Sequence, residues 1–175
     1  MDFPTIFLLG YMGSGKSYTG RQLAQRLGTP FVDLDAMVAA KASRSIRQLV
    51  ADEGLPAFRR LEADSLRLIA PRNTVVACGG GTPLFHDNLD WMNARGITCY
   101  LDTPPAVLAA RLAPERQQRP LLADLTEETL LPFITDHLRE REPTYRRAHL
   151  RYLQTTGREP IADDIRAYLL RIAGH

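Results

Sequence analysis

The sequence predicts an α/β fold, a P-loop three-layer αβα sandwich in which helices cover both faces of a parallel sheet of about five strands. The chain opens with an apolar run at residues 5–9, and a glycine-rich turn and a helical pattern follow it directly. Farther along, short apolar runs alternate with helical patterns, as parallel strands joined by crossover helices require. The length of 175 residues suits one domain, and no repeat or linker divides it.

The glycine-rich turn carries the motif that gives this fold class its name. Gly10-Tyr-Met-Gly-Ser-Gly-Lys-Ser17 fits the pattern G-x-x-x-x-G-K-[ST], with a strand before it and a helix at residues 16–27 after it. Its backbone N–H groups can converge on a phosphate at the positive end of the helix. Lys16 would reach the β- and γ-phosphates, and Ser17 would offer an oxygen to Mg²⁺. A plain turn is the alternative. The expected ATP contacts are Gly13, Ser14, Gly15, Lys16, Ser17 and Tyr18.

The remaining elements follow from apolar runs and helical periodicity. Three helical patterns lie between the second and third strands and predict a helical subdomain over residues 33–62, and the polar residues 113–124 predict a loop. The later strands are expected at residues 30–33, 73–78, 97–101 and 152–154. The helices after the first are expected at residues 35–42, 45–53, 56–70, 86–95, 104–112, 127–145 and 162–172.

Composition excludes several classes of protein. The net charge of +2 and the lack of a basic stripe argue against a nucleic-acid partner. No apolar run approaches the roughly 18 residues that span a bilayer, so no membrane partner is expected. Cys78 and Cys99 lie in apolar strand-like segments, as reduced core cysteines do. We therefore expect a cytoplasmic protein, and a monomer because no further domain is appended.

Asp33-Leu-Asp35 closes the second predicted strand. Alternation along a strand would point both carboxylates to one side, at the sheet edge where α/β folds bind ligands. One carboxylate could then serve Mg²⁺ and the other a substrate hydroxyl. The alternative is that Asp35 only caps the next helix. Asp102, which also ends an apolar strand, is the weaker candidate for Mg²⁺ because two prolines follow shortly after it.

Two further patterns allow a binding role or a plain structural one. Arg59 and Glu62 stand three residues apart on a predicted helix, where they form either a solvated ion pair or an arginine oriented toward a substrate anion. Gly79-Gly80-Gly81 follows a buried strand, and three consecutive glycines suit close approach of a ligand to the backbone better than a turn.

The remaining arginine candidates lie late in the chain. Arg116 and Arg119 belong to the polar loop, which is either a plain exposed loop or one that brings positive charge to a phosphoryl group. Arg139 and Arg141 stand near the end of a long predicted helix, where a solvated end is the default expectation.

Taken in order, these motifs resemble those of the shikimate kinase family over about residues 5–170. The resemblance is carried by the P-loop and by D-x-D, F-R-x-x-E, G-G-G, R-P-L and R-x-P-x-Y. In this chain they read Gly10–Ser17, Asp33–Asp35, Phe58–Glu62, Gly79–Gly81, Arg119-Pro120-Leu121 and Arg141–Tyr145. The chain departs from many members in having Tyr18 where they have threonine, with Ser17 intact.

The resemblance implies transfer of the γ-phosphoryl group of ATP to the 3-hydroxyl of shikimate, a step of chorismate and aromatic amino acid biosynthesis. It implies Mg²⁺ held by Ser17 and Asp33. It also implies a substrate-binding subdomain at residues 33–62 and a lid at residues 113–124 that close over the substrates. The implied catalytic residues are Lys16, Asp35 and Arg119. The implied shikimate contacts are Asp35, Arg59, Glu62, Gly79, Gly80, Gly81 and Arg141. Further implied ATP contacts are Arg119, Arg111 and Arg158.

Other functions remain as alternatives. A gluconate-type kinase would share the P-loop but gives no reason for F-R-x-x-E with G-G-G. A nucleoside monophosphate kinase would need a nucleobase pocket, which the sequence does not reveal. A GTPase-like switch would need an Asn-Lys-x-Asp signature, and neither Lys16 nor Lys41 lies in one. A catalytically dead nucleotide-binding regulator would lack catalytic side chains, yet each expected one is present.

Overall fold

One parallel sheet organises the protein. The computed structural model describes residues 3–119, 121–155 and 159–173. Its strands are β1 (Thr5–Leu9), β2 (Phe31–Asp33), β3 (Val75–Ala77), β4 (Gly96–Asp102) and β5 (Leu150–Leu153). They lie in the order β2-β3-β1-β4-β5, and each pairs with its neighbours in parallel. The prediction of a parallel sheet of about five strands is confirmed.

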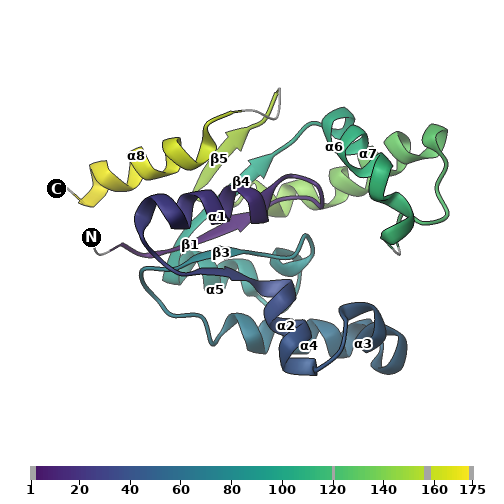
Figure 1. The fold of residues 1–175 in the computed structure, drawn as a ribbon, viewed down its shortest axis with the longest axis horizontal. Helices are drawn as coiled ribbons and strands as arrows, with labels where there is room; N and C mark the ends of the chain where they lie inside the picture. The colour runs from purple at the N-terminus through teal and green to yellow at the C-terminus, as the bar shows by residue number, and fades with distance from the viewer. Residues whose placement is uncertain (1–2, 120, 156–158, 174–175) are drawn as a thin grey trace.

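Helices connect successive strands and cover both faces of the sheet (Figure 1). The predicted bounds of the first helix and of the long helix at residues 127–145 agree with the structure. The α-helices are α1 (Lys16–Leu27), α2 (Leu34–Ala42), α3 (Ile46–Glu53), α4 (Leu55–Leu66), α5 (Asn88–Arg95), α6 (Pro105–Leu112), α7 (Glu127–Tyr145) and α8 (Ile161–Ala173). Two 3₁₀ helices are η1 (Thr82–Leu84) and η2 (Ala113–Gln118).

Alternation along the central strand β1 builds a core on each side of the sheet. Ile6 and Leu8 point to one face, where α1 and α8 pack on them. Phe7 and Leu9 point to the other, where α4 and α5 supply the partners. All four side chains are at most 1% exposed, which explains why this strand is a continuous apolar run instead of an alternating one.

Helices α2, α3 and α4 form the helical insertion between β2 and β3 (Figure 1). A small cluster of its own, Val38, Leu49 and Phe58, holds the three helices together. The insertion and the α6–α7 region extend beyond the sheet on the same side, at the right of the view. This arrangement leaves the carboxyl ends of the central strands between them.

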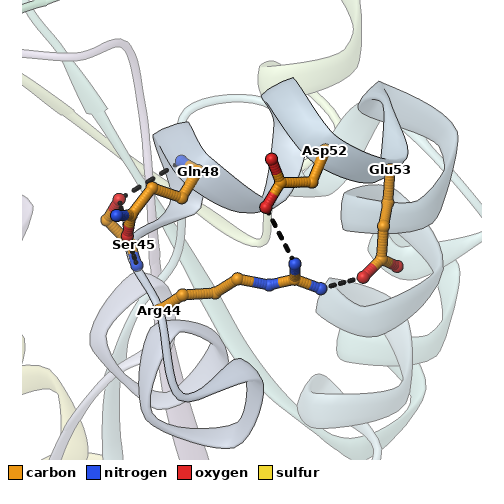
Figure 2. Close-up of polar contacts among 5 residues, drawn as sticks. All are labelled: Arg44, Ser45, Gln48, Asp52 and Glu53. Atoms are coloured by element: carbon orange, nitrogen blue, oxygen red, sulfur yellow. Dashed lines mark hydrogen bonds and ion pairs between the residues drawn. The ribbon is translucent and has the colours of Figure 1, made fainter.

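The turn from α2 into α3 is fixed by polar contacts (Figure 2). Ser45 and Gln48 form a reciprocal capping box at the start of α3. Arg44 pairs with Asp52 at 3.0 Å and also with Glu53. These two acids stand in the last turn of α3, where the helix dipole disfavours negative charge, and Arg44 offsets that repulsion. The contacts fix the turn from α2 into α3 and both ends of α3.

Several element boundaries were predicted wrongly. The predicted helix at residues 56–70 ends at Leu66, because the chain turns there to place Ile69 in the core before Pro71. The third strand pairs only over Val75–Ala77, and the last strand begins earlier than residue 152, at Leu150, where it pairs with β4. Within the described ranges, no helix combines the length and the apolar character needed to cross a membrane.

Candidate active site

The loop between β1 and α1 forms the predicted phosphate cradle. Gly13 and Gly15 have φ angles of 80° and 88°, a region where any side chain would strain the backbone. The Lys16 ammonium donates to the carbonyls of Gly10 and Tyr11 at 2.8 Å each. Enclosure by the loop lowers the pKa of Lys16 to about 8, against the opposing effect of the Asp35 charge.

Ser17 and Asp33 meet beside this cradle. The Ser17 hydroxyl donates to Asp33 Oδ2 at 2.8 Å, while Asp33 Oδ1 accepts from the Ala36 N–H at the start of α2. A hydroxyl and a carboxylate in contact next to a phosphate cradle fit the ligand set of Mg²⁺, which takes one or two protein oxygens together with phosphates. In the described part of the chain, no rival cluster of three metal-binding side chains occurs.

Asp35 does not stand on the strand as predicted. Strand β2 ends at Asp33, which is itself the cap of α2, and Asp35 lies in the first turn of that helix. The alternation argument was therefore wrong, and so was the alternative that Asp35 caps the helix. The Asp35 carboxylate still faces the cavity beside the cradle, described below. It is accessible from that cavity, but the surrounding residues reduce its contact with water. That loss of water, and then the Glu62 charge, raise its pKa above the usual value.

Arg59 and Glu62 form a buried pair, not a solvated one. Arg59 Nη1 donates to Glu62 Oε2 at 2.7 Å, and the Glu62 side chain is fully buried. The second Glu62 oxygen, Oε1, accepts from the Thr82 hydroxyl at 2.6 Å. The Arg59 guanidinium also lies between the rings of Phe58 and Phe85, 4.8 and 4.5 Å from their centres. Glu62 and the two rings thus fix the position of the Arg59 guanidinium.

The three glycines leave room for these side chains. A Cβ on Gly79 would lie 2.7 Å from Asp35 Oδ1 and 3.0 Å from Glu62 Oε1. A Cβ on Gly81 would lie 2.7 Å from the guanidinium carbon of Arg59. Gly80 turns its carbonyl to α7, where the Tyr145 hydroxyl donates to it at 2.5 Å. The glycine run thus lets two charged groups reach the backbone.

A cavity of about 480 Å³ joins these groups. It lies between the helical insertion, the glycine run, the segment after η2 and α7. Five of the predicted residues bring charge to it: Asp35, Arg59, Glu62, Arg119 and Arg141. Its three arginines outnumber its two carboxylates, which gives the cavity an excess of positive charge that suits a small anionic and hydroxylated molecule.

Arg119 belongs to two cavities at once. It lines the 480 Å³ cavity and also an adjoining one of about 300 Å³ around Lys16, Ser17 and Asp33. Its guanidinium pairs with Glu115 at 3.2 Å. No other arginine among the described residues lines both cavities, so Arg119 stands where the phosphate cradle meets the polar cavity.

The other arginines near these motifs differ in whether they reach the cavity. Arg141 lies in the cavity, its guanidinium 5.9 Å from the centre of the Tyr11 ring. Arg139 pairs with Asp136 on the exposed side of α7, and Arg116 pairs with Glu127 at 3.7 Å. Neither of these two arginines lines the 480 Å³ cavity or the one around Lys16.

A third cavity, of about 280 Å³, lies on the outer side of the cradle. Gly13, Tyr18 and Arg111 line it, and the Tyr18 side chain is 70% exposed. Arg111 donates to the Gly13 carbonyl at 3.0 Å and to Gln154 Oε1 at 3.1 Å. Arg158, the remaining predicted nucleotide contact, and Pro120 of the predicted lid lie outside the described residues.

Asp102 is engaged elsewhere. Its carboxylate forms an ion pair with Arg151 on β5 and accepts a hydrogen bond from Tyr100 at 3.2 Å. It lines neither cavity that contains Lys16 or Arg59. The preference for Asp33 over Asp102 as the Mg²⁺ candidate agrees with this arrangement.

Comparison with known proteins gives the same reading as the geometry. A family model described as shikimate kinase matches residues 12–172. The chain belongs to the shikimate kinase family. The shikimate kinase of Nitratidesulfovibrio vulgaris is 44% identical over 170 residues, which are 94% of each chain.

Solved structures of the family have the same fold. The crystal structure of shikimate kinase from Bacteroides thetaiotaomicron has a TM-score of 0.84 and 34% identity, and the match covers 98% of this chain and 97% of that one. Shikimate kinase from Acinetobacter baumannii in complex with shikimate has a TM-score of 0.81 and 33% identity, over 98% of this chain and 93% of that one. The predicted family and fold are confirmed.

Several residues around the site escaped sequence reasoning. Thr82, Phe85 and Gln154 contact predicted site residues, yet none lies in one of the sequence motifs given above. Position was the available signal: Thr82 directly follows the glycine run and Gln154 directly follows the last strand. Neither residue type suggests a partner without the tertiary structure.

Proposed function

We propose that this protein transfers the γ-phosphoryl group of Mg²⁺-bound ATP to the 3-hydroxyl of shikimate, giving shikimate 3-phosphate and ADP. Membership of the shikimate kinase family carries the reaction. The single structural observation that supports it best is Arg119, which lines both the cradle cavity and the cationic cavity beside it. A phosphoryl group passing from one cavity to the other would travel past this guanidinium.

The cationic cavity suits the acceptor. Shikimate carries one carboxylate and three hydroxyls. The guanidinium forks of Arg59 and Arg141 would bind the carboxylate, since arginine recognises planar oxyanions with two parallel hydrogen bonds. Asp35 would accept a hydrogen bond from the reacting hydroxyl, and the glycine run would let the ring approach the backbone. Glu62 would act on the substrate only through Arg59, which it holds at 2.7 Å.

The cradle suits the donor. Its backbone N–H groups and Lys16 would hold the β- and γ-phosphates, while Tyr18 and Arg111 border the cavity where the nucleoside would lie. Ser17 and Asp33 would hold Mg²⁺, Asp33 directly or through water. When bound, the ion supplies positive charge that neutralises the phosphate oxygens.

The reaction needs one bond made and one broken. The 3-oxygen of shikimate would attack the γ-phosphorus, the bond to the β–γ bridging oxygen would break, and ADP would leave. Asp35 would orient the hydroxyl and accept its proton, a role that its raised pKa favours over that of a free aspartate. Lys16 and Arg119 would stabilise the charge on the transferred group. Positioning and charge stabilisation would supply most of the acceleration.

Closure of two segments over the bound substrates would protect the phosphoryl transfer from water. We assign residues 33–62 as the substrate-binding subdomain and residues 113–124 as the lid of one domain spanning residues 1–175. Both segments contribute side chains to the same cavity, Arg59 from the first and Arg119 from the second. Their approach would exclude water and limit ATP hydrolysis. We further propose a monomeric, cytoplasmic enzyme, which light scattering and cell fractionation test.

A coupled assay of ADP release tests the function. Mg-ATP is supplied with shikimate, with no acceptor, with gluconate, or with a set of nucleoside monophosphates. We expect a shikimate-dependent rate well above the ATPase background and no comparable rate with the other acceptors. Turnover only with gluconate or a nucleotide would keep the kinase and overturn the assigned acceptor. Binding of ATP without any turnover would indicate a regulator instead.

A further inference from the structure

A line of buried polar side chains leads from Arg59 through Glu62, in the wall of the cavity, to Thr82. Thr82 donates its hydroxyl to Glu62 Oε1, and Glu62 Oε2 accepts from Arg59. Thr82 and Glu62 are both fully buried. Each oxygen of this carboxylate therefore has its own partner, one neutral and one cationic.

The backbone of Thr82 is held in place by hydrogen bonds of its own. The Thr82 N–H donates to the Gly79 carbonyl at 3.1 Å, and the Thr82 carbonyl accepts from Asn88 Nδ2 at 2.9 Å. Asn88, also fully buried, accepts from Arg67 Nη1 at 2.7 Å. Arg67 is anchored in turn on the carbonyls of Ala63 and His86. The threonine thus stands on a rigid support that spans α4, η1 and α5.

Loss of the Thr82 hydroxyl would change where Arg59 points. Within the described chain, Arg59 Nε is a buried donor with no hydrogen-bond partner. A Glu62 Oε1 that has lost Thr82 would be a buried acceptor with none. The two would satisfy each other if the guanidinium turned to bind Glu62 with both N–H groups. That turn would move the fork away from the cavity.

We propose that Thr82, supported by Asn88, is a positioning residue for the acceptor. By occupying Glu62 Oε1, it restricts Arg59 to a single hydrogen bond with that carboxylate and leaves the rest of the fork for the substrate carboxylate. The inference rests on the proposed function, in which Arg59 binds shikimate. Thr82 contacts no substrate and acts only through Glu62.

The test first compares three single variants with the wild-type enzyme. Thr82→Val removes the hydroxyl at nearly constant shape, and Thr82→Ser restores it. Thr98→Val is the matched control, because Thr98 is an equally buried threonine on β4 that does not line the cavity. Its hydroxyl donates to Asn93 Oδ1 at 2.6 Å. For each protein the KM values for shikimate and ATP, kcat, and the Kd for shikimate from calorimetry are measured.

We expect Thr82→Val to raise the KM and Kd for shikimate about tenfold or more, because a charge-assisted contact is displaced. The KM for ATP should stay within about twofold, and Thr82→Ser should recover most of the shikimate affinity. In a Glu62→Gln background, Thr82→Val should add little further loss, since its route to Arg59 is already broken. Thr98→Val should lower thermal stability without changing the ratio of the two KM values.

Different results would overturn different statements. A wild-type enzyme without shikimate-dependent turnover overturns the proposed function and this inference with it. An active wild type with an unchanged shikimate KM in Thr82→Val, or with both KM values rising together, overturns the inference alone. Should Thr82→Val not fold, Thr82→Ala removes the same hydroxyl without the second methyl group, and the same criteria apply.

Discussion

A methyl group added to Gly81 should displace Arg59 without distorting the backbone. Gly81 has φ −93° and ψ −13°, an ordinary helical conformation that alanine adopts readily. Its new Cβ would lie 2.7 Å from the Arg59 guanidinium carbon and 2.8 Å from Nη1. Nη2 of Arg59 would be closer still to the new Cβ, and ordinary contact begins near 3.4 Å, so the guanidinium must retreat by about 1 Å.

The structure sets the size of the expected effect. A hydrogen-bonded charged contact contributes about 1.5–3 kcal/mol, so loss of the Arg59 contact to the substrate should raise the KM for shikimate about 10–150-fold. Folding should be affected less than substrate binding, because the atoms that must move belong to a side chain and not to the backbone. The free energy of unfolding should change by about 1 kcal/mol or less, since alanine also restricts the unfolded chain.

Initial-rate kinetics and urea unfolding of Gly81→Ala measure both quantities. Gly80→Ala gives a graded comparison, because its nearest neighbour, the backbone nitrogen of Met12, lies 3.4 Å from the added Cβ. We expect a smaller rise in KM there. A Gly81→Ala enzyme with wild-type affinity for shikimate would refute the reasoning, as would equal losses in the two variants.

Three further predictions concern the donor side. Arg119→Ala should lower kcat by about 10³–10⁵ while the KM for shikimate changes little. Arg116→Ala, the matched control from the same segment, should leave kcat near normal. An Arg119→Ala enzyme in which only KM changes would contradict the assignment. Asp33→Asn should raise the Mg²⁺ concentration needed for half-maximal rate about tenfold, and an unchanged Mg²⁺ titration would count against the pairing of Asp33 with Ser17. Burial lowers the pKa of Lys16 to about 8, so the free enzyme loses this positive charge as the pH rises through 8. ATP affinity, measured by titration, should therefore be constant below that pH and fall above it. An ATP affinity that stays constant up to about pH 9 would disprove this role of the Lys16 charge.

The helical insertion also makes a stability contrast possible. Arg44 lies on the surface of the α2–α3 turn and pairs with acids that are 59% and 49% exposed, so such pairs stabilise weakly. Arg59 pairs with a fully buried acid, and removal of one partner of a buried pair is costly. The same kind of ion pair thus contributes little to stability at Arg44, whereas at Arg59 it fixes the position of the guanidinium.

The sequence by itself determined the fold class and the family. Short apolar runs separated by helical periodicity are local signals, and so is the P-loop, whose glycines are required by positive φ angles at Gly13 and Gly15. The helices at residues 16–27 and 127–145 were therefore placed correctly. Shorter elements, such as β3 and β5, were misplaced by one to a few residues, because pairing with a neighbouring strand sets their ends.

Only the tertiary structure decided which charges work together. Arg59 with Glu62 and Arg139 with Asp136 have the same spacing of three residues, yet burial separates a fixed pair from a solvated one. Local periodicity could not reveal this difference, since burial depends on elements distant in the chain. The placement of Asp35 in a helix and the contact of Thr82 with Glu62, 20 residues away, depend in the same way on packing between elements.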